Sequence, residues 1–419
     1  MSRKTIQRPV AADAPPEALR LAGITRSMGR SALRDLLGAA SAPGLCSFAV
    51  GVPATDLFPA EDMERAAAEV LRHDPRALQY GLPSDALKTQ VVELMRLRGA
   101  EVREEQVFLT SGAQQAMDLL TRLLLDPGGR VVLEETIYDG IQMVIRPFAP
   151  EVLTVPTCPE RGLDLDALEA LLDEGARPAF LYVVPEGHNP MGTSLDVEQR
   201  TRLVELARRH ALPILEDDAY GLLRYDDAVA PPLRALDDRF VFYLGSFSKI
   251  LAPALRVGWI VVPEELIPLL SALKHATDID TASFAQRAVA AYLEAGHLPA
   301  HLERLRAAYR TRRDTMLQAL ARHMPDGVSW HAPPAGIFVW LELPPGTDTM
   351  ALLGNAIRRD RVAFCPGRAF AADGGDHADH CLRLSFADLS PERIEGGIER
   401  LGSAIAAAGL ADRQAAGSA

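Results

Sequence analysis

Short apolar runs alternate with amphipathic helical patterns between about residues 60 and 265, and this alternation limits the possible fold more than any other feature of the chain. Six runs have the length and composition of buried strands. They lie at residues 106–110, 131–134, 180–184, 213–216, 241–244 and 257–262. Helical patterns separate several of them, at residues 114–125, 165–172 and 197–208. This order predicts an α/β fold around a mainly parallel sheet that is covered on both faces.

The pattern changes after about residue 280. Residues 285–322 read as helix with one break at 296–299, short strands follow at 328–331, 337–342 and 382–386, and a helix follows at 391–407. These elements predict a smaller α+β domain. We expect residues 1–57 to form an N-terminal arm and part of that domain, 58–282 the large domain and 283–419 the small one. Within the arm, residues 1–20 are expected to be mobile, and 28–40 to form a short amphipathic helix.

Composition, net charge and cysteine spacing argue against several classes of protein. The formal net charge of −12 argues against nonspecific nucleic-acid binding through a basic surface. No apolar run approaches the roughly 18 residues of a membrane span, and no apolar signal core follows the basic N-terminal residues. The four cysteines are scattered, at Cys46, Cys158, Cys365 and Cys381, which predicts neither a disulfide framework nor a zinc ribbon. These features predict a cytoplasmic protein.

One lysine stands out chemically. Lys249 follows the small hydroxyl residues Ser246 and Ser248 soon after the strand pattern 241–244, and Arg256 comes before the next strand pattern. A buried lysine, or one beside other cations, has a lowered pKa, so that its neutral amine attacks an aldehyde. An arginine nearby suits a phosphate, and pyridoxal 5'-phosphate (PLP) needs both groups. A lone lysine would more simply be a surface residue, but the surrounding pattern favours the PLP interpretation.

Polar segments follow the predicted strands at residues 111–114, 185–192, 217–220 and 246–249. Ligands of parallel α/β sheets bind at the carboxyl ends of the strands, so these segments are expected to meet at one site. A carboxylate at Asp217 would keep the PLP ring nitrogen protonated, which the cofactor requires to act as an electron sink. Tyr220 and Asn189 are candidate donors to the O3' oxygen of the ring. In isolation, each of these segments could also be an ordinary solvated turn.

Two further features of the sequence are typical of anion-binding sites. The segment 112–114 opens a helix directly after a strand, where free backbone N–H groups and the helix dipole bind phosphate, although ordinary helix capping is the alternative interpretation. Arg383 interrupts an apolar strand, and a buried arginine needs an anionic partner. Its fork geometry suits a carboxylate. The alternative for Arg383 is a structural salt bridge.

The residues 245–259 resemble the Ser-x-Ser-Lys-x-x-x-Pro-x-x-Arg-x-Gly signature of the fold-type I PLP-dependent aminotransferases. The segment 47–59 resembles the Ser-Phe-x-x-Gly-x-Pro…Phe-Pro segment of the 2-aminoadipate and kynurenine aminotransferase group, and the agreement extends over about residues 46–405. The resemblance implies a seven-stranded sheet, PLP as the cofactor and a homodimer with a shared active site. The implied substrates are a 2-oxo acid and an L-amino acid that is aromatic, 2-aminoadipate-like or non-proteinogenic. Glutamate and 2-oxoglutarate are the expected second pair.

The resemblance also assigns roles to individual residues. Lys249, Asp217 and Tyr220 are expected to be catalytic. The expected cofactor contacts are Gly112, Ala113, Gln114, Tyr138, Asn189, Asp217, Tyr220, Ser246, Ser248, Lys249 and Arg256, together with Tyr80 from the neighbouring subunit. The expected substrate contacts are Arg383, Asn189 and Gly51. For Tyr138 and Tyr80 a packing role is the competing interpretation.

The chain departs from the family pattern at Val50, Ala113, His188, Met191 and Ala335. We interpret these departures as a changed substrate and not as lost chemistry. Two alternatives stay open: another PLP-dependent reaction on an unusual amino acid, such as oxidation, decarboxylation or cyclisation, and a non-catalytic PLP-binding or amino-acid-sensing protein.

Three further interpretations are not favoured. The group includes transcription regulators with a DNA-binding domain ahead of this fold, but too few residues precede Ser47 for such a domain. Arg26 and Arg30 could contact a distal carboxylate of the substrate or could be surface charges. The histidines at positions 297 and 301 and the segment 376–381 have a metal-like composition, but no metal site is expected.

Overall fold

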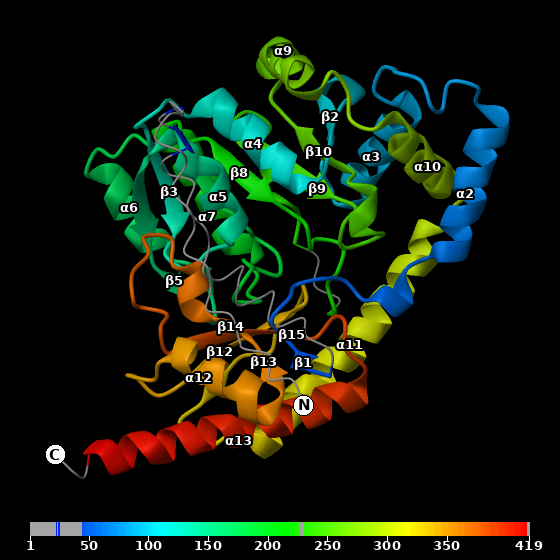
Figure 1. The fold of residues 1–419 in the computed structure, drawn as a ribbon. Helices are drawn as coiled ribbons and strands as arrows, with labels where there is room; N and C mark the ends of the chain where they lie inside the picture. The colour runs from blue at the N-terminus through cyan, green and yellow to red at the C-terminus, as the bar shows by residue number, and fades with distance from the viewer. Residues whose placement is uncertain (1–21, 23, 26–43, 227–229, 417–419) are drawn as a thin grey trace, which may run out of the picture.

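The structure is a computed structural model that describes residues 22, 24–25, 44–226 and 230–416 of the 419-residue chain. Within these residues the largest sheet has seven strands, in the order β2-β10-β9-β8-β7-β3-β4 (Figure 1). The strands are β2 (Val107–Thr110), β3 (Arg130–Glu134), β4 (Glu151–Val155), β7 (Leu181–Val183), β8 (Ile214–Asp217), β9 (Val241–Ser246) and β10 (Gly258–Val261). Strand β10 runs antiparallel to β2 and β9, whereas the other neighbouring pairs run parallel. The predicted mainly parallel seven-stranded sheet is confirmed.

The sequence patterns predict six of these strands individually and miss β4. This strand lies at the edge of the sheet, beside β3. Val152, Leu153 and Thr154 are only half-buried, so β4 lacks the continuous apolar run that marks a strand buried on both faces.

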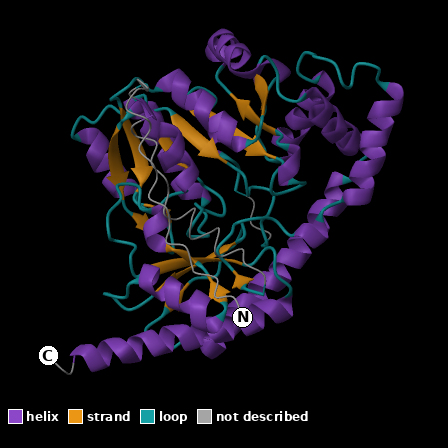
Figure 2. Ribbon diagram, in the orientation of Figure 1, coloured by secondary structure: helices purple, strands orange, loops and turns teal. Residues whose placement is uncertain are grey.

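Helices cover both faces of the large sheet, because successive side chains of a strand point in opposite directions. In β3, Val131 and Leu133 belong to one hydrophobic core, whereas Val132 belongs to another. Helices α4 (Ala113–Leu124) and α5 (Asp139–Ile145) pack on the first core, and α6 (Leu165–Asp173) and α7 (Val197–His210) pack on the second (Figure 2). Two earlier helices, α2 (Ala60–His73) and α3 (Asp85–Leu97), are not predicted from the sequence. Helix α2 buries only Ala66 and Val70, so its apolar stripe is sparse.

A smaller sheet lies below the large one in Figure 1. Its four antiparallel strands are β11 (Ser329–Trp330), β12 (Phe338–Glu342), β15 (Cys381–Ser385) and β14 (Cys365–Pro366). Nearby, β1 (Cys46–Ser47) pairs in parallel with β13 (Val362–Ala363), which brings the N-terminal part of the described chain to this region. The predicted helical break is found between α10 (Ser283–Glu294) and α11 (Leu298–His323), and α12 (Thr349–Asn355) and α13 (Pro391–Ala416) complete the helices here.

Some sequence predictions remain predictions. The division of the chain at residues 57 and 282 is one of them. The expected arm at 1–20, the helix at 28–40, and Arg26 and Arg30 lie outside the described residues.

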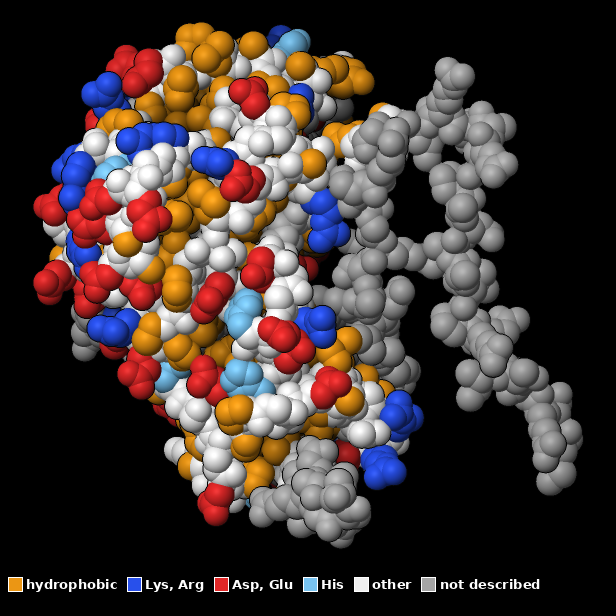
Figure 3. Space-filling view, turned by 90° about the vertical axis from the view of Figure 1, so that its left-hand side faces the viewer, with side chains coloured by type: hydrophobic (Ala, Val, Ile, Leu, Met, Phe, Trp, Pro, Cys, Tyr) orange, Lys and Arg blue, Asp and Glu red, His pale blue; other side chains and the backbone are white. Residues whose placement is uncertain are grey.

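The face of the molecule in Figure 3 shows acidic, basic and hydrophobic side chains interspersed. Ion pairs join many of the surface charges; for example, Arg202 lies 2.6 Å from Asp166 and 2.7 Å from Glu169. Among the helices that the structure describes, none is both long enough and apolar enough to cross a membrane.

Candidate active site

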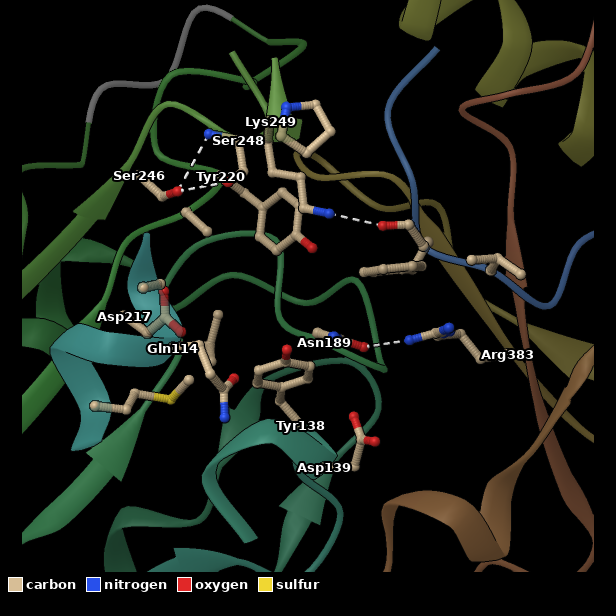
Figure 4. Close-up of a pocket in the computed structure, with 18 of the residues that line it drawn as sticks. Gln114, Tyr138, Asp139, Asn189, Asp217, Tyr220, Ser246, Ser248, Lys249 and Arg383 are labelled. Carbon is tan, nitrogen blue, oxygen red and sulfur yellow. Dashed lines mark hydrogen bonds between the residues drawn. The ribbon is translucent and has the colours of Figure 1, made fainter. Parts of the chain in front are cut away.

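A cavity of about 330 Å³ lies where β7, β8 and β9 end, between the large and the small sheet (Figure 4). Twelve of the residues predicted from the sequence line it: Gly51, Ala113, Gln114, Tyr138, Asn189, Asp217, Tyr220, Ser246, Ser248, Lys249, Arg256 and Arg383. They come from segments far apart in the chain. The expectation that polar segments after the strands meet at one edge of the sheet is therefore met.

Lys249 follows β9 and its amine points into the cavity (Figure 4). The Nζ atom donates a hydrogen bond to the carbonyl oxygen of Gly51 at 2.7 Å. Burial lowers the pKa of Lys249 to about 8, with a further contribution from the positive charge of Arg383, while Asp217 opposes the shift. Near neutral pH, part of the Lys249 population therefore carries a neutral, nucleophilic amine.

Asp217 is the last residue of β8, and donors from Tyr182 and the backbone of Ala219 stabilise its carboxylate. Its Oδ2 atom accepts from the hydroxyl of Tyr182 at 2.7 Å, whereas Oδ1 is buried and has no hydrogen-bond partner among the described residues. Burial raises the pKa of Asp217 to about 6, and the bond from Tyr182 opposes this rise. A buried carboxylate oxygen without a partner suits a positively charged N–H group brought by a ligand.

Tyr182 is not among the site residues predicted from the sequence. It is the middle residue of β7, where Leu181 and Val183 point into one core and Tyr182 points to the opposite face of the sheet. Strand alternation would place Tyr182 on the same face as the cavity, but it would not reveal the contact with Asp217.

The start of α4 and Arg256 form a second polar wall. Gly112 precedes the helix with φ +79°, and a Cβ atom at this position would lie 2.6 Å from the Nη2 atom of Arg256. Arg256 Nη2 donates to the carbonyl oxygen of Ser111 at 2.8 Å. Ser246 and Ser248 stand close by, with their Oγ atoms 3.0 Å apart. Glycine thus lets the guanidinium approach the free N–H groups at the helix N-terminus, and Ala113 adds no hydroxyl to this cradle.

Tyr138 directly precedes α5, and its ring lies beside the cavity (Figure 4). A Cβ atom at Gly140 would fall 2.1 Å from that ring, so only glycine fits two residues after the tyrosine. Gln114 donates to the carbonyl oxygen of Gly140 at 3.2 Å, which joins the starts of α4 and α5. Burial raises the pKa of Tyr138 to about 12, so its hydroxyl stays protonated at neutral pH.

Arg383 enters the cavity from the small sheet. Its Nη1 atom donates to Asn189 Oδ1 at 2.7 Å, and Nη2 donates to the carbonyl oxygen of Ala49 at 2.8 Å (Figure 4). Among the residues that the structure describes, none places a carboxylate oxygen within 4.0 Å of the guanidinium. The alternative of a structural salt bridge therefore finds no partner in this part of the chain. Tyr220 lies nearby, and burial raises the pKa of its hydroxyl.

Tyr80 lies outside this group of residues. It is not among the residues that line the cavity, and 86% of its surface is exposed. Its neighbours Leu78 and Leu82 are similarly exposed, at 79% and 86%. Packing within the described part of the chain therefore does not explain Tyr80.

The chain matches the family model of aminotransferases of class I and II over residues 44–401. The chain belongs to this family. It is 40% identical to the 2-aminoadipate transaminase of Thermus thermophilus over 383 residues, which cover 90% of this chain and 94% of the relative. It is 38% identical to the aromatic-amino-acid aminotransferase 1 of Thermococcus litoralis over 389 residues, which cover 90% and 92%.

A solved structure extends the likeness to the fold. The α-aminoadipate aminotransferase LysN from Thermus thermophilus, complexed with N-(5'-phosphopyridoxyl)-L-leucine, superimposes with a TM-score of 0.85 at 39% identity. The match covers 93% of this chain and 97% of that structure. The protein is thus a fold-type I, PLP-dependent aminotransferase, as the sequence predicts.

The departures from the family pattern fall in two groups. Val50 and Ala113 line the cavity, whereas His188, Met191 and Ala335 do not. His188 is buried behind the site, with its Nε2 atom 3.3 Å from Glu134 Oε1. For the segment 376–381, the structure places His377 Nε2 3.1 Å from the hydroxyl of Thr136, and no group of three or more metal-ligating side chains is found among the described residues.

Proposed function

We propose that Lys249 is the catalytic lysine of this aminotransferase. Bound PLP supplies an aldehyde that accepts the amino group and a ring that withdraws electrons from the substrate. Lys249 Nζ would hold the cofactor in the resting enzyme. As a free amine, the same group would accept and move the proton of the substrate Cα. The single observation that carries this proposal is the buried amine with a lowered pKa, in one cavity with Asp217 and Arg383.

We further assign the cofactor contacts. Asp217 Oδ1, which has no hydrogen-bond partner in the described part of the chain, would accept the ring N–H and keep it protonated, while Tyr182 holds the other oxygen. The amide oxygen of Asn189 is taken by Arg383, so its NH₂ group is free to donate to the O3' oxygen, together with Tyr220. Tyr138 would stack on the ring. The phosphate would be held by Gly112, Ala113, Gln114, Ser246, Ser248 and Arg256.

We propose that Arg383 binds the α-carboxylate of the substrate, with Asn189 and Gly51 beside it. A Cβ atom at Gly51 would lie 2.7 Å from the ring of Phe338, so glycine keeps this part of the cavity open. Val50 and Phe338 give the same region an apolar lining. Together with the activities for which the relatives are named, this lining supports an aromatic or 2-aminoadipate-like L-amino acid as one substrate, with a non-proteinogenic amino acid as the alternative. 2-Oxoglutarate as the acceptor is proposed from the family resemblance.

The test is a half-reaction with single amino acids and no 2-oxo acid. We would follow the visible absorbance of the PLP-loaded enzyme and the appearance of pyridoxamine phosphate. Aromatic amino acids, 2-aminoadipate and glutamate should convert the cofactor fastest. Oxygen consumption or carbon dioxide release without pyridoxamine phosphate would instead support another PLP-dependent reaction, and a stable complex that never turns over would support a sensor.

We propose a homodimer in which Tyr80 reaches the cofactor phosphate of the neighbouring subunit. The exposure of Leu78, Tyr80 and Leu82 supports a partner on this surface. The cytoplasm stays the expected compartment, and the four cysteines are free, as in a reducing environment.

Mixing two inactive variants tests the shared site. We expect Lys249→Ala and Tyr80→Ala each to lower activity, and a dissociated and reassociated mixture to regain about a quarter of the wild-type sites, because hybrid dimers pair one intact lysine with one intact tyrosine. If Tyr80 served its own subunit, every hybrid site would keep one lesion and no activity would return. Light scattering on the mixture verifies that dimers are present.

A further inference from the structure

The guanidinium of Arg383 lies against two aromatic rings. Its Cζ atom is 4.2 Å from the ring centre of Phe338 and 4.7 Å from the ring centre of Phe370. Both phenylalanines are almost completely buried. Burial of a cation is costly without an opposite charge, and the faces of aromatic rings attract cations, so the rings supply part of the missing stabilisation.

This arrangement leaves hydrogen-bond donors of Arg383 available. Arginine carries five N–H donors. One is used by Asn189 and one by the carbonyl oxygen of Ala49, while Nε is buried without a partner. A carboxylate partner from the protein would compete with a substrate carboxylate for the same donors. Aromatic rings attract a cation without occupying its N–H donors as a carboxylate would.

Phe370 is itself fixed from the large sheet. Its carbonyl oxygen accepts from the backbone N–H of Ile137 at 2.9 Å, and Ala372 N donates to the carbonyl oxygen of Glu135 at 2.9 Å. The ring of Phe370 packs edge-on against Trp340 with centroids 6.2 Å apart. The segment that carries Phe370 is thus bound to the segment that leads into Tyr138.

We propose that Phe338 and Phe370 are positioning residues that clamp Arg383 for recognition of the substrate carboxylate. The proposal rests on the proposed role of Arg383. The two rings restrict the position of the guanidinium, while the hydrogen bonds to Asn189 and Ala49 restrict its rotation. A substrate carboxylate then meets an edge of donors that is already oriented, which limits the ordering cost of binding.

Phe370 is the better residue to change. Phe338 lines the cavity and packs edge-on against Tyr220 at 5.9 Å, so its substitution would disturb several contacts at once. Phe370 is not among the lining residues. We would compare Phe370→Leu with the wild-type holoenzyme. The matched control is Phe364→Leu, which changes a fully buried phenylalanine. Among the described residues, the rings that contact the Arg383 guanidinium are those of Phe338 and Phe370.

The first measurement is the KM of the fastest amino acid and the Kd of its deaminated carboxylate, 3-phenylpropionate for phenylalanine or glutarate for glutamate, from the absorbance of bound PLP. We expect Phe370→Leu to raise both by about tenfold with a smaller change in kcat. Phe364→Leu should change them by less than about twofold. If the two variants had equal effects, Phe370 would contribute only to core packing, and the proposal would be overturned.

The second measurement replaces Phe370 with mono-, di- and trifluorophenylalanine. Fluorine weakens the attraction between ring and cation while the ring shape is nearly kept. The Kd of the carboxylate probe should rise stepwise with each fluorine, and a flat series would also overturn the proposal. Arg383→Lys separates the two hypotheses: if it leaves the Kd unchanged, the proposed carboxylate role fails, whereas an effect of Arg383→Lys with a flat fluorine series removes only the clamp.

Discussion

Replacing Lys249 by alanine is expected to lower kcat/KM by at least about 10⁴-fold, because one change removes both the proposed covalent anchor of the cofactor and the proposed base that moves the proton. Bound PLP should still be found, since the phosphate cradle and Asp217 do not depend on the lysine side chain. The measurement is a single-turnover reaction of PLP-loaded enzyme with the fastest amino acid. Lys249→Arg is the matched variant, since it keeps a long cation but provides no neutral amine.

The wild-type apoenzyme offers a second readout of the same lysine. Only the neutral amine attacks the aldehyde, and its fraction grows as the pH rises through the pKa of about 8. The rate of PLP uptake should therefore rise toward this pH, and Lys249→Ala should not show that rise. Methylamine should restore part of the variant's activity. A loss of less than about tenfold, or normal PLP uptake kinetics in the variant, would assign the chemistry to another group.

The sequence predicts most strands of the large sheet and many of the residues that line the site. Six of the seven strands are apolar runs that can be read directly from the chain, whereas β4 is half exposed at an edge and is visible only through the family resemblance. Residues that follow strands, such as Asp217 and Lys249, can be placed at the site because parallel strands end together. Such a placement requires no knowledge of distances.

Contacts between segments that are far apart in the chain cannot be predicted from the local sequence. Tyr182 and Phe370 read as ordinary core residues, since nothing in their local sequence indicates that one touches Asp217 and the other Arg383. The stacking of a ring on a guanidinium depends on how the small sheet packs against the segment before Tyr138. Local pattern carries no information on that packing. Sequence therefore identifies the groups that do chemistry, while the groups that hold them in place emerge from the structure.

Asp217→Asn is expected to lower kcat by about 10³-fold, because a neutral amide cannot hold the positive charge on the ring nitrogen of PLP. Asp217→Glu should lose less, as it keeps the charge at a displaced position. Tyr182→Phe removes the hydrogen bond to Oδ2 but leaves the carboxylate, so about a tenfold effect or less is expected. The measurement is the rate of the half-reaction with the fastest amino acid, together with the absorbance of the bound cofactor.

Thermal stability of the cofactor-free protein distinguishes a functional from a structural role of Asp217. Burial raises its pKa to about 6 in the folded protein from 3.8, so the folded state binds the proton more tightly than the unfolded state. The ionised carboxylate therefore lowers the stability of the folded state above that pKa, and the penalty is relieved as the pH falls through it. Asp217→Asn should then melt at or above the wild-type temperature at pH 8 while losing activity. A variant that loses activity and also melts well below wild type would show that Asp217 mainly supports the fold.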